Sequence, residues 1–137
     1  MNIIVDTNII ISALIKDSVT RKIIIQCNDN LFFPKIMIDE IKRHNNVILS
    51  KSGLSQDNLE TILNTLLKYI KIIHSDEIKN FIPKARKIME KIDPGDVIFI
   101  AAALYKNAAI WSDDKDFQKQ KEVKIFTTSN MVKRVLR

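Results

Sequence analysis

The sequence predicts an α/β fold in which a parallel sheet of about five strands carries helices on both faces. Short apolar segments typical of buried strands alternate with helical segments along the 137 residues, and this alternation favours a parallel sheet. Several strand segments are continuously apolar, as expected of strands that are covered on both faces. No repeat, linker or low-complexity tract divides the chain, so we expect a single domain over residues 1–137.

Five segments have the composition of buried strands. Each is short, apolar and partly β-branched or aromatic, and together they cover 2–5, 31–33, 69–74, 108–111 and 123–126. Helical patterns fill the intervening segments: 8–27 with a break near Asp17–Ser18, then 35–48, 54–67, 81–91, 97–104 and 128–137. Strand and helix segments alternate along most of the chain, as a chain of βα units requires.

Local signals mark where two of these helices begin. A loop at 50–58 precedes an amphipathic helix that either Ser55 or Asp57 caps, and Asp57 has capping-box spacing to Glu60. In "DPGD" Asp93 is the cap and Pro94 the first helical residue. The apolar "VIFIAAAL" that follows should lie deep in the core.

Composition limits the classes of function. The net charge is +6 and the pI about 9.5, which favours an anionic partner such as nucleic acid; a lysine-rich surface kept for solubility is the alternative. The single cysteine, Cys27, excludes an intramolecular disulfide framework. Neither a bilayer-spanning stretch nor a signal peptide is recognisable, so we expect a cytoplasmic protein without a membrane segment.

Carboxylates recur where the predicted strands end. Asp6 directly follows the first strand and Glu40 lies in the helix after the second. Asp96 lies in the first turn of the apolar helix, and Asp114 follows the fourth strand. Because parallel strands and their following helices share one edge of the sheet, these four acids are predicted to meet there.

Each acid also has a local alternative role. Asp6 and Asp96 could cap helices, Glu40 could pair with Arg43 or His44, and Asp114 could form an Asx turn. One shared site explains all of them together. Because clustered carboxylates repel one another unless protons or a cation offset the charge, Mg²⁺ or Mn²⁺ is the expected counter-charge.

Other chemistries lack their residues. Two histidines and one cysteine are too few for a typical zinc site, and no nucleophile-elbow signature supports a serine triad. With only Gly53 and Gly95, neither a dinucleotide-binding fingerprint nor a P-loop can exist. A magnesium-carboxylate site in a basic protein instead suits hydrolysis of phosphodiester bonds.

Basic side chains that could hold a nucleic-acid backbone are spread along the chain. The pair Lys42 and Arg43 lies beside Glu40 on the same predicted helix. Further candidates are Lys16, Arg21, Lys22, Lys84, Arg86, Lys87, Lys133, Arg134 and Arg137. Together they would make binding sensitive to salt.

The chain resembles the PIN-domain family, and more closely its small single-domain members that include the VapC-type toxins. Four segments carry the resemblance, in the family's order and over nearly the whole chain: "IIVDTNIIISAL", "IDEIKR", "DPGDVIFIAAAL" and "IWSDDKDF". The resemblance implies a three-layer α/β/α Rossmann-like fold. It also implies a metal-dependent endoribonuclease that uses Mg²⁺ or Mn²⁺.

The resemblance assigns roles to residues. The acidic quartet maps to Asp6, Glu40, Asp96 and Asp114, with Asp6, Asp96 and Asp114 on the metal and Glu40 on the metal or the attacking water. Supporting roles fall to Asn8, which would steady Asp6, to Ser112 before the last acid, and to Asp116. Family spacing from Ser112 selects Asp114 over Asp113, and Asp93 is either a cap or a remote neighbour of the metal.

The resemblance also implies partners. RNA would be the substrate, and the protein would be the toxin of a VapBC-type pair whose small antitoxin masks the acidic groove. A homodimer is expected, with the helix of 54–67 as one contributor. The alternatives are a non-catalytic RNA-binding module of the same fold and, ranked last, a structure-specific DNA nuclease.

Overall fold

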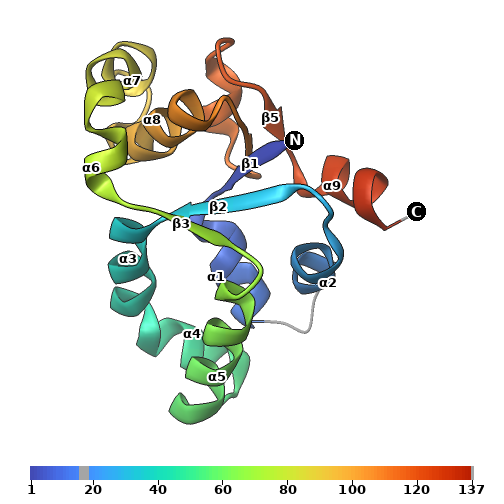
Figure 1. The fold of residues 1–137 in the computed structure, drawn as a ribbon. Helices are drawn as coiled ribbons and strands as arrows, with labels where there is room; N and C mark the ends of the chain where they lie inside the picture. The colour runs from blue at the N-terminus through green and yellow to red at the C-terminus, as the bar shows by residue number, and fades with distance from the viewer. Residues whose placement is uncertain (16–18, 137) are drawn as a thin grey trace.

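The computed structural model describes residues 1–15 and 19–136, and it contains one five-stranded parallel sheet. The predicted break at Asp17–Ser18 and the predicted backbone contacts Lys16 and Arg137 lie outside these residues. The strands are β1 (Asn2–Val5), β2 (Asn30–Pro34), β3 (Lys71–Ile73), β4 (Ala109–Trp111) and β5 (Ile125–Phe126), in the order β3-β2-β1-β4-β5 (Figure 1). The predicted parallel sheet is therefore confirmed.

The helices follow the predicted segments with local differences. They are α1 (Thr7–Ile15), α2 (Val19–Gln26), α3 (Ile38–Arg43), α4 (Asn45–Ser52), α5 (Gln56–Leu67), α6 (Ser75–Ile78), α7 (Ile82–Met89), α8 (Val97–Lys106) and α9 (Thr128–Val135). Single 3₁₀ turns cover Lys35–Met37, Lys79–Phe81, Pro94–Asp96 and Lys115–Lys119. The short helix α6 was not among the predicted elements.

The segment after β2 departs most from its prediction. The single helix expected at 35–48 is a 3₁₀ turn followed by α3 and α4, which separate at His44. The loop predicted at 50–58 is shorter, because α4 continues to Ser52 and ends at Gly53, whose φ of 71° is the left-handed conformation that glycine adopts at helix ends. Ser55 caps α5 by accepting a hydrogen bond from the Asn58 amide at 3.2 Å, so Asp57 is not the cap.

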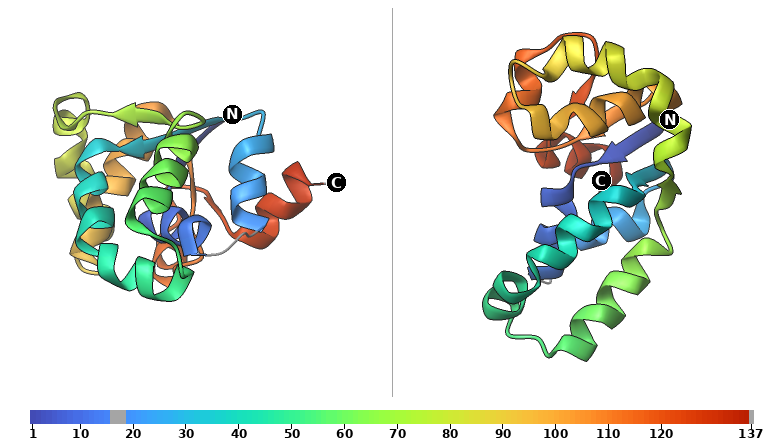
Figure 2. Two further views of the ribbon diagram at one scale, coloured as in Figure 1. Left: turned by 90° about the horizontal axis from the view of Figure 1, so that it is seen from below. Right: turned by 90° about the vertical axis from the view of Figure 1, so that its left-hand side faces the viewer.

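The sheet lies between two layers of helices. Helix α8 packs on β1, β2 and β4, with α6 and α7 beyond it. Helices α1 to α5 lie on the opposite side of the sheet, and α9 packs against α2 (Figure 1). Three layers of this kind are the predicted α/β/α architecture, and the right-hand view of Figure 2 shows α4 and α5 as an arm that extends away from the sheet.

The core is built from the central strands and the helix that covers them. Ile3, Ile4, Ile110 and Trp111 are fully buried. In α8 Phe99 and Ile100 are also buried, as the apolar run of this helix predicted. This packing holds the carboxyl end of β1 and the amino end of α8 in place, and both carry candidate site residues.

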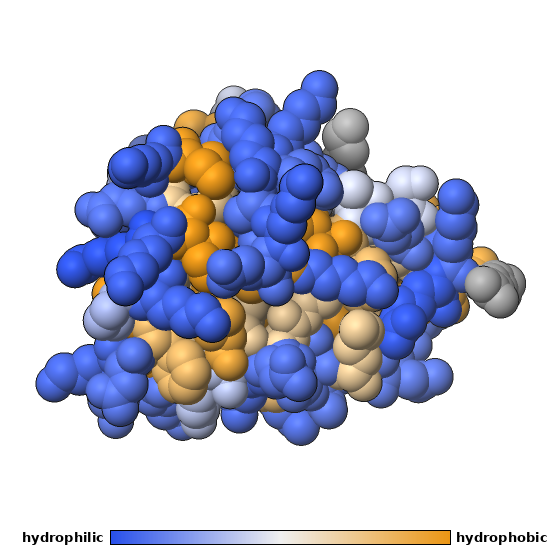
Figure 3. Space-filling model, turned by 90° about the horizontal axis from the view of Figure 1, so that it is seen from above, coloured by the Kyte–Doolittle hydropathy of each residue, from blue (hydrophilic) through white to orange (hydrophobic). Residues whose placement is uncertain are grey.

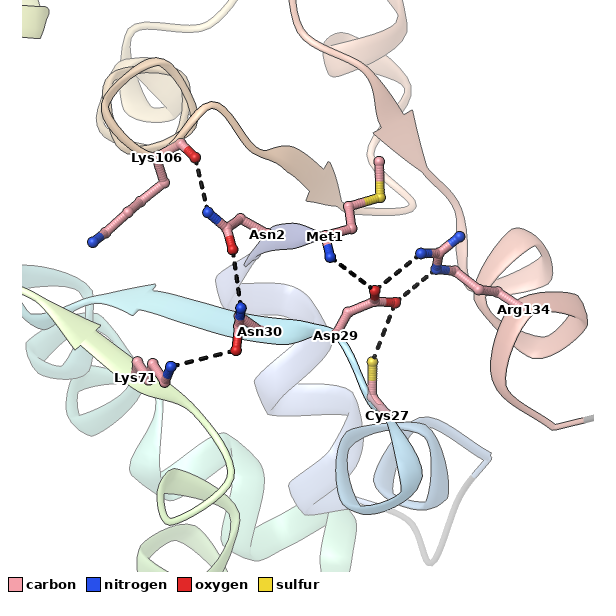
Figure 4. A network of polar contacts seen from close by, with 8 residues as sticks. All are labelled: Met1, Asn2, Cys27, Asp29, Asn30, Lys71, Lys106 and Arg134. Carbon is pink, nitrogen blue, oxygen red and sulfur yellow. Dashed lines mark hydrogen bonds and ion pairs between the residues drawn. The ribbon is translucent and has the colours of Figure 1, made fainter.

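A polar network joins the amino ends of β1 and β2 to each other and to α9 (Figure 4). Asp29 accepts hydrogen bonds from the Arg134 guanidinium at 2.7 and 3.0 Å, and the amino group of Met1 lies 3.3 Å from the same carboxylate. These contacts hold the pKa of Asp29 below its usual range, mainly through the hydrogen bonds from Arg134. Arg134, a predicted nucleic-acid contact, thus joins α9 to the turn before β2.

Candidate metal centre

Strand pairing brings Asp6 next to the end of β4. The amide of Asp6 donates to the carbonyl of Trp111 at 3.0 Å, which continues the β1–β4 ladder by one residue. Asp6 is only 4% exposed and Ser112 is fully buried. Two residues 106 positions apart in sequence therefore lie side by side at the carboxyl edge of the sheet.

The Ser112 hydroxyl connects two of the predicted site residues. It donates to Asp6 Oδ2 at 2.7 Å and accepts a hydrogen bond from the amide of Asp114 at 3.0 Å. The backbone amides of Thr7 and Asn8 also hydrogen-bond to the Asp6 carboxylate. The orientation of Asp6 is thus set by the start of α1 on one side and by the end of β4 on the other.

Four aspartates, one of which is Asp114, come together near Asp6 and Ser112. Each of Asp93, Asp96, Asp114 and Asp116 offers one carboxylate oxygen, and these four oxygens lie within 4.8 Å of one another. Asp93 precedes the 3₁₀ turn that leads into α8, and Asp96 is the last residue of that turn. Asp114 precedes the turn at Lys115–Lys119, and Asp116 lies within it. We call these four residues the aspartate cluster.

Local roles occupy only one oxygen of several of these carboxylates. Asp93 Oδ1 accepts a hydrogen bond from the Gly95 amide, and Asp114 Oδ1 accepts one from the Asp116 amide, each at 2.9 Å. Asp116 Oδ1 pairs with Lys119 Nζ at 2.8 Å. Asp93 is therefore a cap as predicted, and Asp114 forms the Asx turn that was its alternative role, whereas the Asp96 side chain makes no capping hydrogen bond to α8. The second oxygen of Asp93, Asp114 and Asp116 remains for a ligand.

The surroundings of Asp96 disfavour the negatively charged form of its carboxylate. Its side chain is 9% exposed, and its Oδ2 is buried without a hydrogen-bond partner. Burial raises the pKa of Asp96 to about 8, and the negative charges of Asp93, Asp6 and Asp114 add to this shift. Burial likewise raises the pKa of Asp6 to about 6, while the hydrogen bond from Ser112 opposes the increase.

The donor set fits a hard divalent cation. Carboxylate oxygens are the ligands that Mg²⁺ and Mn²⁺ prefer, and within the described residues no histidine or cysteine belongs to the cluster. A cation would also replace the protons that the raised pKa values of Asp6 and Asp96 indicate. The buried Oδ2 of Asp96 has no hydrogen-bond partner, and a bound cation would give it a partner of opposite charge.

Other predicted residues lie in different surroundings. Glu40 is half-buried in α3 and does not belong to the aspartate cluster. Asn8 has an exposed side chain, so its contact with Asp6 is made by the backbone. Lys42 and Arg43 are exposed on α3.

Asp113 is directed to another element. Its Oδ1 accepts a hydrogen bond from the Thr128 amide at 2.7 Å, and its Oδ2 accepts one from the Thr128 hydroxyl at 2.6 Å. The same hydroxyl accepts a hydrogen bond from Trp111 Nε1 at 3.1 Å. Asp113 thus holds the first turn of α9.

One residue next to Asp6 was not anticipated from the sequence. The hydroxyl of Thr7 is buried without a hydrogen-bond partner, directly after Asp6. In the sequence, only the position of this threonine directly after Asp6, in "VDTN", could have indicated a role near the site. Asp93 was expected as a cap or a remote neighbour, whereas the structure places its carboxylate both on the Gly95 amide and in the cluster.

Comparisons with known proteins agree with this arrangement. A family model described as a PIN domain matches residues 4–134. No curated protein matches the chain. Among solved structures, a chain in the crystal structure of VapBC2 from Rickettsia felis bound to a DNA fragment from their promoter is similar in fold, with a TM-score of 0.68.

The two chains are 19% identical, and the similarity covers 93% of this chain and 98% of the other. At this identity the likeness concerns the fold, and the family model supplies the assignment. No helix in the described part of the chain is long and apolar enough to cross a membrane. Because the PIN-domain model spans nearly all of its residues, this chain belongs to the PIN-domain family.

Proposed function

We propose that this protein is a divalent-metal-dependent endoribonuclease that hydrolyses RNA phosphodiester bonds. The observation that carries the proposal is the buried Asp96 Oδ2, which has no hydrogen-bond partner and lies among three further carboxylates. Such a cluster is unfavourable for a protein that never binds a cation. The net charge of +6 provides attraction for a polyanionic substrate despite the local acidic patch.

A bound Mg²⁺ or Mn²⁺ would supply charge stabilisation at the phosphorus and a lowered pKa for an attacking water. Asp6, Asp96 and Asp114 would hold it, directly or through water, and the cluster adds Asp93 and Asp116 as candidates. Ser112 would keep Asp6 oriented through its 2.7 Å hydrogen bond. Glu40 would orient or deprotonate the water from α3.

The biological role that we propose is the toxin of a VapBC-type pair. A solved structure similar in fold is a complex named VapBC2, and its match covers nearly all of both chains. A small antitoxin would mask the acidic site of this chain. We also expect a homodimer in the cytoplasm; in α5, Leu59 and Leu66 are buried within the protomer, so any contribution of this helix would come from its other residues.

An RNA-cleavage assay tests the proposed activity. Purified full-length protein is incubated with labelled single-stranded RNA in Mg²⁺, Mn²⁺ or EDTA. We expect cleavage that stops in EDTA and that falls by more than about 100-fold in Asp96→Asn, beyond the effect of losing an outer-shell partner of a metal. Asp57→Asn removes the same charge from the exposed surface of α5 and should cleave like the wild type.

Each of the other outcomes would point to a different site or function. A folded Asp96→Asn variant that cleaves as fast as the wild type would overturn the assignment of the site. RNA binding without cleavage in either metal would favour a non-catalytic RNA-binding module. Cleavage confined to branched or flapped DNA would favour a structure-specific DNA nuclease.

A further inference from the structure

A lysine-lined groove adjoins the aspartate cluster. It has a volume of about 780 Å³ and lies between α7 and the segment 119–122. Lys84 and Lys87 line it from the helix, and Lys119 and Lys121 line it from the opposite segment. Figure 3 looks onto this side of the molecule, where hydrophilic side chains predominate and patches of hydrophobic residues lie between them.

The groove combines charge with an apolar surface. Ile88 and Ile92 also line it, and both are half-buried. Among its lining residues Glu122 is the single acidic one. Ammonium groups beside aliphatic side chains suit a strand of nucleotides, whose phosphates are anionic and whose bases have apolar faces.

One wall of the groove is a rigid segment. Gln120 is 9% exposed, and its amide nitrogen donates to the carbonyls of Phe117 at 2.9 Å and Val123 at 2.8 Å. Its amide oxygen accepts hydrogen bonds from the backbone amides of Glu122 at 3.0 Å and Val123 at 2.9 Å. Four hydrogen bonds to one buried side chain hold the backbone of Lys119 and Lys121 in place, so less ordering is required when a ligand binds.

Both walls lead directly to the aspartate cluster. On the helix side, Ile92 in the groove is followed in the chain by Asp93 of the cluster. On the other side, Lys119 of the groove forms its ion pair with Asp116 of the cluster. A strand whose phosphodiester lies at the aspartate cluster would therefore continue into the groove.

We infer that this groove binds the backbone of single-stranded RNA next to the bond that is cleaved. The inference rests on the proposed ribonuclease function for the identity of the strand, whereas the groove and its charge do not depend on it. Phosphates lie against Lys84, Lys87 and Lys121, and a base or ribose lies over Ile88 and Ile92. The groove thus supplies affinity and register while the acidic residues hold the reacting phosphate.

The test measures binding separately from cleavage. Binding of a fluorescent single-stranded RNA to full-length protein is followed by anisotropy in EDTA, between 50 and 300 mM salt. The variant Lys84→Ala/Lys87→Ala should bind at least about tenfold more weakly at low salt. Its salt dependence should be less steep by about 1.4 in the log–log slope, since each phosphate contact to a single strand contributes about 0.7.

The matched control is Lys51→Ala/Lys68→Ala, which removes the same charge from exposed positions outside the groove. It should bind RNA like the wild type. Lys121→Glu tests the opposite wall independently and should weaken binding as well. Circular dichroism and thermal unfolding confirm that each variant is folded, as the exposure of these lysines leads us to expect.

Cleavage kinetics in Mn²⁺ complete the test. In Lys84→Ala/Lys87→Ala, KM for a long RNA should rise with kcat unchanged, because the groove contributes the same binding in the ground state and the transition state. If the groove variants bind RNA like the control, the inference is wrong even where cleavage is normal. If RNA binding weakens as expected but neither the wild type nor any variant cleaves RNA, the inference about the groove is supported and the ribonuclease proposal fails.

Two further binding experiments distinguish RNA from other ligands of the groove. A DNA oligonucleotide of the same sequence shows whether the groove distinguishes RNA from DNA, and equal loss of affinity for both would confine the inference to a general single-stranded backbone. A peptide of alternating Glu and Gly shows whether an acidic protein segment is the ligand. Loss of peptide binding in the groove variants, with RNA binding unchanged, would overturn the inference.

Discussion

The hydroxyl of Ser112 donates a 2.7 Å hydrogen bond to Asp6 Oδ2, and both side chains are buried at the carboxyl edge of the sheet. The same hydroxyl accepts the amide of Asp114 at 3.0 Å. One side chain therefore sets the positions of two acids that lie on different segments. This relationship makes Ser112 the natural first target for mutation.

Ser112→Ala should weaken both folding and metal binding. The substitution leaves the Asp6 carboxylate and the Asp114 amide without this partner, which costs about 1–3 kcal/mol when buried groups lose a hydrogen bond. Loss of an outer-shell contact should lower metal affinity by about 10–100-fold. Urea unfolding and Mn²⁺ titration calorimetry measure the two effects, with the exposed Ser129→Ala as control; unchanged Mn²⁺ affinity would remove Ser112 from the site.

Asp96→Asn should leave the metal-free protein no less stable than the wild type. The substitution removes a buried negative charge, and the new amide can donate a hydrogen bond to the neighbouring Asp93 carboxylate. Mn²⁺ should stabilise the wild type in thermal unfolding and should have little effect on the variant. A variant that loses stability in EDTA and is still stabilised by Mn²⁺ would indicate that Asp96 serves only the start of α8.

Stability of the metal-free protein should fall as pH rises from about 4 to about 8. The pKa of Asp6 is raised to about 6 and that of Asp96 to about 8, so the folded state binds more protons than the unfolded state in this range. Stability contributed by these protonated carboxyls is complete below their unfolded pKa of about 4 and is lost through the folded values. Urea unfolding in EDTA across this range checks the slope.

Divalent metal should flatten that pH dependence. A bound cation takes the place of the protons on Asp6 and Asp96, so the two carboxylates can ionise without loss of stability. The same series in saturating Mn²⁺ should show little decline up to pH 8. An equal decline with and without Mn²⁺ would place the ion elsewhere.

Asp113→Ala should destabilise the protein without affecting the metal. Asp113 accepts two hydrogen bonds from Thr128 at the start of α9, so its removal should cost about 0.5–2 kcal/mol, as for other helix caps. Its neighbour Asp114 remains in the cluster. Thermal unfolding should therefore shift downward while Mn²⁺ affinity stays at the wild-type value; a large loss of Mn²⁺ affinity would contradict this division of roles.

Asp29→Asn should destabilise the protein most clearly near neutral pH. The pKa of Asp29 is lowered by Arg134, so its contribution is present above the unfolded value and is lost as pH falls through the folded value. Because the ion pair with Arg134 is partly exposed, we expect a cost of up to about 1 kcal/mol at pH 7. The difference between variant and wild type in urea unfolding should narrow below about pH 4.

Local sequence signals determined much of this protein. The apolar run before Asp6 specified β1, and Asp93 with Pro94 specified the turn into the buried helix α8. The alternation of such segments was sufficient for the parallel three-layer fold, because buried strands and amphipathic helices bury their apolar faces in few arrangements. Acidic residues at strand ends were also visible, since the carboxyl edge follows from topology alone.

Tertiary structure decided which acids meet. Asp113, Asp114 and Asp116 are near neighbours in sequence, yet Thr128 draws Asp113 to α9 while a 3₁₀ turn directs the other two to Asp93 and Asp96. Glu40 lies on a helix as expected, yet it is not part of that cluster. The sequence determined the elements and the charges at their ends. The directions of Asp6 and Asp113 depended on hydrogen bonds from Ser112 and Thr128, which lie on other segments of the chain and which local patterns do not encode.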